Sequence, residues 1–208
     1  MKKTIEEHAA RFSALAPEYD DTQDSDEYRA CVSLVVHYAD PSPDDVVLDL
    51  GTGTGAIALA LAPAAKRVIG RDISEGMLEQ ARRKAAEVGI ENVEFGEGRF
   101  RDPNVPDGEQ IDVVVSNFAM HHLPDEEKRE AIQRIADLEP RRFVLGDVMF
   151  FGTPDPTEPF YSPEVDDPAT VGMLADALTD AGFVLTAVEA VHDQVGVLVA
   201  ERARSPEE

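Results

Sequence analysis

Short apolar runs alternate with helix-like segments from residue 46 to the end of the chain. The first run, Val46 to Leu50, is almost wholly apolar and follows the turn-forming residues 41–45. Short apolar runs between helical segments are typical of strands that are buried in a parallel sheet. The pattern therefore predicts an α/β fold that is built from repeated strand–helix–strand units.

The same periodicities place the remaining elements. The predicted strands lie at residues 46–50, 68–70, 93–95, 111–115, 142–146, 184–191 and 195–200. The predicted helices lie at residues 56–62, 75–88, 124–138 and 167–182. Ser74 can cap the second helix and Gly89 can end it. Only residues 192–194 join the last two strands, which is too short for a helical crossover, so these strands form an antiparallel hairpin. We predict a doubly wound, mostly parallel seven-stranded sheet with this antiparallel C-terminal hairpin.

The region before the first strand predicts a helical cap. Residues 1–40 suggest one or two helices over the sheet, with the acidic stretch 20–27 as a mobile connector. Residues 41–208 then form the main domain. A length of 208 residues suits one structural domain overall.

The net charge of the chain argues against nucleic acids and anionic membranes as partners. The chain has 42 acidic and 19 basic residues, a net charge of −23. Such a surface repels phosphates, so we expect neither nucleic-acid binding nor stable association with an anionic membrane. The basic residues are mostly arginine, and with the acidic excess this favours a salt-adapted, halophilic cytoplasm over an ordinary acidic protein. The N-terminus lacks the apolar segment of a secretory signal, which also indicates a cytoplasmic protein.

Metal and disulfide chemistry are not expected. Cys31 is the single cysteine, so it can form no internal disulfide and no cysteine-based zinc site. His8, His37 and His192 are scattered singly along the chain. The sequence therefore predicts no metal site.

The strongest chemical signal is a glycine-rich turn after the first strand. Residues 47–55 read VLDLGTGTG, where glycines allow a tight turn and close approach to a ligand. Asp72 ends the second strand about twenty residues later, where a carboxylate can accept hydrogen bonds from ribose hydroxyls. Asp49 would repel a pyrophosphate but attract an ammonium group. The pattern thus favours a nucleoside that carries an amino acid.

At this point the sequence resembles the class I S-adenosylmethionine-dependent methyltransferases. Residues 47–55 are similar to the first motif of the family, residues 68–78 to the second and residues 111–123 to the fourth. The terminal hairpin resembles the reversed seventh strand of the family. Residues 11–20 resemble an N-terminal element of its small-molecule, quinone-methylating branch.

The resemblance implies a binding site for S-adenosylmethionine and for the product S-adenosylhomocysteine. Gly51, Thr52 and Gly53 would pass under the methionine part. Asp49 would lie near the amino group, and Asn117 would face the same end.

The nucleoside end follows from the second motif. Asp72 would hold the ribose, while Ile73 and Met77 would pack on the adenine. The family usually has Gly-Asp-Ala after the third strand, but residues 98–100 are Gly-Arg-Phe, so the Phe100 backbone or ring would hold the adenine instead. Tyr19 would either close over the cofactor or anchor the N-terminal segment.

The candidate catalytic residue is His121, a general base for an acceptor hydroxyl or acidic carbon. The alternative is that His121 and His122 cap a helix and pack. Methyl transfer from a sulfonium can also proceed by positioning alone. The Asn/Asp-Pro-Pro-aromatic motif of amide and base methylation is missing at residues 116–119. The aromatic segment 149–161 forms either a substrate wall or part of the core.

These observations predict transfer of a methyl group from S-adenosylmethionine to an oxygen, carbon, sulfur or amine nucleophile on a small molecule. Two alternatives stay open. A nicotinamide-dependent oxidoreductase fits the looser fingerprint of Gly51, Gly53 and Ala56. A non-catalytic S-adenosylmethionine-binding module would explain the missing adenine acid. The sequence is compatible with a monomer or a homodimer.

Overall fold

The computed structural model describes residues 4–23, 25–153 and 160–202. Its strands are β1 (Val46–Leu50), β2 (Arg67–Asp72), β3 (Val93–Glu97), β4 (Val113–Asn117), β5 (Arg142–Phe150), β6 (Ala169–Thr170), β7 (Phe183–His192) and β8 (Val195–Arg202). Its helices are α1 (Ile5–Leu15), α2 (Tyr19–Thr22), α3 (Asp26–Ala39), α4 (Ala56–Leu61), α5 (Glu75–Val88), α6 (Asp125–Asp137) and α7 (Val171–Asp180). Two 3₁₀ turns, η1 (Ala16–Glu18) and η2 (Met120–His122), complete the elements.

The strands form one mixed sheet in the order β3-β2-β1-β4-β5-β8-β7. The first five of these strands pair in parallel, while β8 is antiparallel to both β5 and β7. This confirms the Rossmann-like α/β fold and the antiparallel terminal hairpin. The seven strands of this path are the seven that were predicted, and the short β6 adds an eighth strand that pairs with β5 outside the path.

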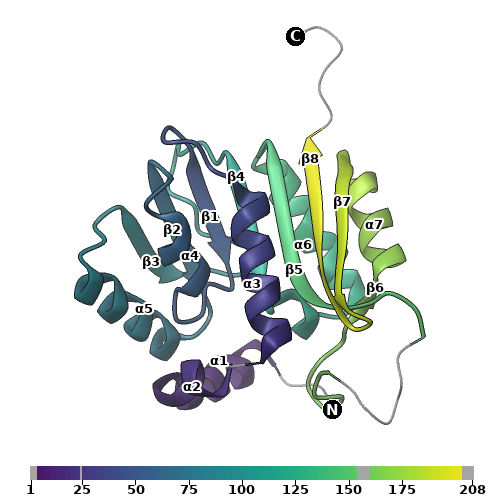
Figure 1. Ribbon diagram of the computed structural model, residues 1–208, viewed down its shortest axis with the longest axis horizontal. Helices are drawn as coiled ribbons and strands as arrows, with labels where there is room; N and C mark the ends of the chain where they lie inside the picture. Colours follow the sequence, from purple (N-terminus) through teal and green to yellow (C-terminus); the bar gives the residue numbers. More distant parts are fainter. Residues whose placement is uncertain (1–3, 24, 154–159, 203–208) are drawn as a thin grey trace, which may run out of the picture.

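Helices cover both faces of the sheet (Figure 1). Cys31 and Val35 of α3 pack with Ile57 of α4 on one face. Ile132 of α6 and Leu174 of α7 pack on the other face. Because apolar side chains from both layers are removed from water, this burial supplies the main stabilisation of the fold.

Local capping explains where the predicted helices begin and end. The Ser74 side chain accepts the Met77 N–H at the start of α5, and Gly89 ends this helix with a φ of +70°. Both caps were predicted. The helix predicted from residue 167 starts later, because Thr170 accepts the Met173 N–H and thus sets the first turn of α7.

The N-terminal segment lies in two different environments. Helix α3 contributes to the core, whereas α1 and α2 lie across one end of the sheet (Figure 1). The prediction of a mobile acidic connector is wrong for the described residues, since α2 and α3 include most of this stretch. Asp20 also accepts hydrogen bonds from Thr54 Oγ1 at 2.6 Å and Lys84 Nζ at 2.8 Å, which fix α2 beside the glycine turn. None of the helices in the described ranges has both the length and the apolar character required to cross a bilayer.

Candidate functional site

The glycine turn follows β1 at the end of the sheet that α1 covers. Gly51 and Gly53 have φ values of +73° and +53°, in the left-handed region that favours glycine. A Cβ at Gly51 would lie 2.3 Å from the Cβ of Ala119, so the turn and the segment after β4 approach closely here. A Cβ at Gly53 would meet no protein atom within 4 Å. Gly53 therefore faces open space.

Two carboxylates hold this turn in shape. Asp49, whose exposed fraction is 1%, accepts a hydrogen bond from Thr52 Oγ1 at 2.7 Å. The pKa of Asp49 is raised to about 7, because burial and the nearby charge of Asp72 outweigh the hydrogen bond from Thr52, which lowers it. Asp72 accepts the Gly53 N–H at 2.8 Å and the Ser74 N–H at 2.9 Å. Burial raises the pKa of Asp72 as well, against these two hydrogen bonds.

A cavity of about 690 Å³ opens above the turn. Its volume lies within the range of small-molecule sites, roughly 300–1,000 Å³. All ten residues that sequence reasoning assigned to the cofactor line it: Tyr19, Asp49, Gly51, Thr52, Gly53, Asp72, Ile73, Met77, Phe100 and Asn117. The structure thus brings together residues from separate stretches of the chain.

Helix α1 covers this cavity. Ser13 Oγ lies 2.9 Å from Ser74 Oγ, a hydrogen bond that joins α1 to the start of α5. The Phe12 ring lies 6.4 Å from the Tyr19 ring and 5.2 Å from the His122 ring, measured between centroids. Aromatic side chains therefore enclose the cavity on the side of α1.

The adenine side of the cavity differs from the prediction in one respect. The backbones of Arg99 and Asp102 pair through two hydrogen bonds, of 2.8 and 3.1 Å, which form a tight loop. This loop places Asp102 in the cavity lining together with Phe100. Sequence reasoning looked for an acid at residue 99 and missed the one that lies three residues later.

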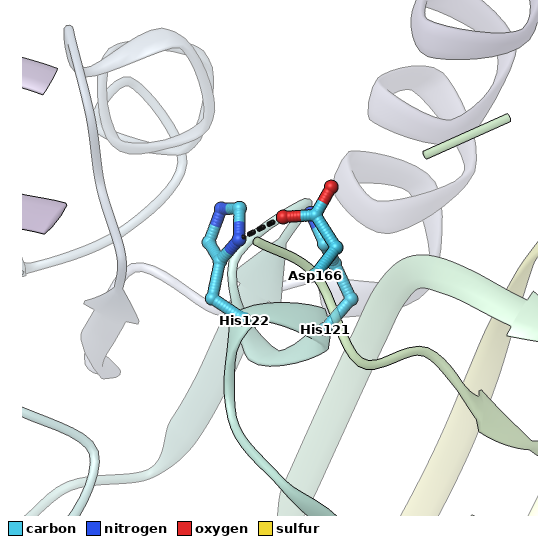
Figure 2. A group of neighbouring side chains, drawn as sticks. All are labelled: His121, His122 and Asp166. Atoms are coloured by element: carbon cyan, nitrogen blue, oxygen red, sulfur yellow. Dashed lines mark hydrogen bonds and ion pairs between the residues drawn. The ribbon is translucent and has the colours of Figure 1, made fainter. Parts of the chain in front are cut away.

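The two adjacent histidines occupy different positions. His122 lines the cavity, whereas His121, the predicted general base, does not. His121 is buried, and its Nδ1 lies 2.5 Å from Asp147 Oδ1 on β5. His122 Nδ1 lies 2.7 Å from Asp166 Oδ1 (Figure 2). The pKa of His122 is lowered to about 4, because burial and the neighbouring His121 together outweigh the hydrogen bond to Asp166, which raises it. The His122 side chain is therefore neutral at pH 7.

The described part of the aromatic segment 149–161 does not line the cavity. The Phe150 and Tyr161 rings lie 5.6 Å apart, and Phe151 packs against the core. None of the described residues of segment 149–161 lines the cavity, and residues 154–159 lie outside the described ranges. The described part supports the interpretation as core.

With this geometry in place, comparisons with known proteins decide the family. A methyltransferase-domain family matches residues 47–139. An uncharacterized methyltransferase of Bacillus pumilus (strain SAFR-032) is 34% identical over 155 residues, which cover 69% of this chain and 68% of the relative. The chain belongs to the methyltransferase family. Its fold is that of the class I S-adenosylmethionine-dependent methyltransferases.

The likeness to one further relative is seen in both its sequence and its solved structure. The uncharacterized methyltransferase YcgJ of Bacillus subtilis (strain 168) is 34% identical over 118 residues, which cover 56% of this chain and 46% of YcgJ. In the YcgJ crystal structure the likeness has a TM-score of 0.65 at 26% identity, with 76% and 70% of the two chains covered. The chain thus spans about half the length of several curated relatives.

A solved structure with a bound product shows the same fold. Magnesium protoporphyrin IX methyltransferase of Synechocystis PCC 6803 with S-adenosylhomocysteine has a TM-score of 0.73 at 21% identity, covering 94% of this chain and 98% of the other. These relatives support a methyltransferase over the nicotinamide-dependent alternative.

Proposed function

We propose that this methyltransferase transfers the methyl group of S-adenosylmethionine to an oxygen, carbon, sulfur or amine nucleophile on a small molecule. The observation that carries the proposal is the single cavity that all ten predicted cofactor residues line. Its two carboxylates and its open glycine turn fit a ligand that carries both an ammonium group and a ribose.

The residues at the methionine end fit the cofactor through charge and space. Asp49 is a buried acceptor next to the turn, so in its ionised form it would attract the amino group. Gly53 would leave room for the amino-acid chain, since a Cβ there would project into open space. Asn117 lines the same cavity and offers an amide to this end. When bound, the cofactor supplies an electrophilic methyl group on a sulfonium.

The nucleoside end uses Asp72, Ile73 and Met77. Each Asp72 oxygen already accepts one backbone N–H, and a carboxylate has further lone pairs for the ribose hydroxyls. Ile73 and Met77 provide apolar surface for the adenine. We infer that Asp102 takes the part of the missing adenine acid, because it lines the cavity beside Phe100.

The chain itself would contribute orientation and exclusion of water to the reaction. Phe12, Tyr19, Tyr28 and Phe118 line the cavity, and the Phe12 ring lies beside His122. These rings would shield the reacting atoms from solvent. They also suit an acceptor with an apolar or planar part, as in the small-molecule branch that the sequence resembles. His122 replaces His121 as the histidine that an acceptor can reach.

Calorimetry with S-adenosylhomocysteine tests the cofactor site. We expect Asp72→Ala to weaken binding at least about 10-fold, because a hydrogen bond to a charged group contributes about 1.5–3 kcal/mol. The control Glu91→Ala removes an exposed acid that does not line the cavity, and should bind like the wild type. Equal affinity in the two variants would contradict the ribose assignment.

A methyl-release assay tests the activity. Phenols, quinols, thiols and amines would be offered with S-adenosylmethionine, and turnover on one of these classes is expected. Cofactor binding without turnover on any acceptor would instead favour the non-catalytic binding module.

A further inference from the structure

Four side chains from distant parts of the chain meet behind the cavity wall. His121 and His122 lie on η2, Asp147 lies on β5, and Asp166 lies in the segment before β6. Figure 2 shows that His121, His122 and Asp166 converge, and their ligand atoms lie within 4.8 Å of one another. Sequence reasoning missed this cluster because Asp166 is 44 residues away from His122.

Asp147 orients His121. Its Oδ2 accepts the backbone N–H of His121 at 3.0 Å, and its Oδ1 lies 2.5 Å from the ring Nδ1. A carboxylate only accepts hydrogen bonds, so Nδ1 carries a proton and Nε2 is the ring nitrogen that is turned toward the cluster. Nε2 lies 4.0 Å from Asp166 Oδ1, which is beyond hydrogen-bond distance. The ring nitrogen that could bind a metal ion therefore faces a carboxylate oxygen without a direct hydrogen bond to it.

Asp166 is held with one oxygen toward the histidines. Its Oδ2 accepts the Ser162 N–H at 2.7 Å, which leaves Oδ1 facing His121 and His122. The next peptide is fixed too, because the Asp167 N–H donates to the His121 carbonyl at 2.7 Å. Lys128 Nζ on α6 donates to the Asp167 and Leu123 carbonyls and to Asp125. Its charge is thus engaged outside the cluster.

We propose that His121, His122 and Asp166 bind a divalent transition-metal ion, with Asp147 as the residue that positions His121. Two imidazoles and one carboxylate form a ligand set typical of Zn²⁺, Fe²⁺, Co²⁺ and Mn²⁺ sites that keep open positions. A carboxylate on the second ring nitrogen of a ligating histidine is the usual partner in such sites. The carboxylates of Asp147 and Asp166 also give the cluster negative charge, which favours a cation.

Two of the three ligand pairs already lie near the spacing that a metal ion needs. Ligand atoms bound about 2.1 Å from one ion in a tetrahedron lie roughly 3.4 Å apart. The His122–Asp166 pair at 2.7 Å would open, and the His121–Asp166 pair at 4.0 Å would close, each by less than about 1 Å. The proton on His122 Nδ1 would move to Nε2 of the same ring or to solvent as the ion binds. The ion would then join η2 to the segment 162–167.

Titration of the metal-free protein with Co²⁺, followed by its visible absorption, tests the site. High salt in the buffer screens weak ion binding to the acidic surface. We expect saturation at one ion per chain. Asp166→Asn and His122→Gln should each weaken binding by more than about 100-fold, since outer partners alone change metal affinity by 10–100-fold. Asp147→Asn should weaken it by about 10–100-fold.

Glu164→Gln is the matched control, because it removes an exposed carboxylate from the same segment. It should bind Co²⁺ like the wild type. The absence of saturable absorption in the wild type, or equal affinity in Asp166→Asn and Glu164→Gln, would overturn the proposal and leave hydrogen-bonded His–Asp pairs only. Calorimetry with S-adenosylhomocysteine on the same samples serves as a control for folding. Asp166 does not line the cavity, so a folded Asp166→Asn variant should bind this ligand like the wild type even when it has lost the metal. If Asp166→Asn does not fold, the Co²⁺ affinity of His122→Gln is compared with that of Glu164→Gln instead.

Discussion

Cofactor affinity should depend on pH through Asp49. The pKa of this buried carboxyl is raised to about 7, and the proposed amino-group contact requires its ionised form. Between pH 7.5 and pH 5.5 the ionised fraction falls from about 0.76 to about 0.03, while the ligand amino group stays largely protonated. The Kd for S-adenosylhomocysteine should therefore rise about 25-fold, or about 2 kcal/mol.

Asp49→Asn isolates this effect. The substituted amide would still accept the hydrogen bond from Thr52 but would carry no charge. We expect weaker binding at pH 7.5 and a much flatter profile between pH 5.5 and 7.5, measured by calorimetry. The same 25-fold slope in wild type and Asp49→Asn, or a flat profile in the wild type, would refute the assignment of Asp49 to the amino group.

The raised pKa of Asp49 should also make the stability of the fold depend on pH. The pKa of Asp49 is about 7 in the folded protein and about 3.9 in the unfolded chain, so ionisation opposes folding. The stability that the protonated form provides is fully present below pH 4 and is lost as the pH rises through 7. The stability advantage of Asp49→Asn should therefore grow between these values to about 4 kcal/mol. Urea unfolding at pH 4 and pH 8 measures it, and equal stability of the two proteins at pH 8 would contradict the burial argument.

Three further predictions concern the turn, the adenine and the surface. Gly51→Ala should cost about 2–5 kcal/mol of stability, because it combines left-handed strain with overpacking against Ala119. Gly53→Ala should cost only about 1–2 kcal/mol, because a Cβ there meets no protein atom. Equal urea midpoints of the two variants would contradict this. Asp102→Ala should lose discrimination between S-adenosylhomocysteine and its inosine analogue in calorimetry, and retained discrimination would place the adenine acid elsewhere. The melting temperature should rise from low to molar salt as screening reduces self-repulsion at a charge of −23, and a flat response would remove the salt-adaptation hypothesis.

Local signals explain what the sequence predicted well. Strand β1 and the glycine turn follow from neighbouring residues, and so do the Ser74 cap and the Gly89 stop of α5. The first-motif and second-motif residues lie at the ends of adjacent parallel strands, so their meeting at one cavity follows from the topology.

Long-range contacts explain what the sequence could not predict. Choosing between His121 and His122 requires knowing that Asp147 on β5 holds one ring away from the cavity. Asp166 reaches these histidines only because Ser162 turns its segment back toward η2. The start of α7 shifts for a similar reason, since Asp167 is bonded to the His121 carbonyl and stays outside the helix.

Three buried acids differ from the many surface acids of this protein, which keep it hydrated. Asp49, Asp147 and Asp166 are at most 9% exposed, and within the described ranges none of the three forms an ion pair with lysine or arginine. Burying an ionised carboxylate without such a partner costs several kcal/mol, whereas a chain with so many surface acids has no need of these three for solubility. One lies in the proposed cofactor cavity and two lie on the proposed metal cluster. For Asp49, whose pKa burial raises, this cost is understandable if a ligand cation completes the cofactor cavity. This is why Asp49→Asn should stabilise the free protein while weakening its affinity for the cofactor.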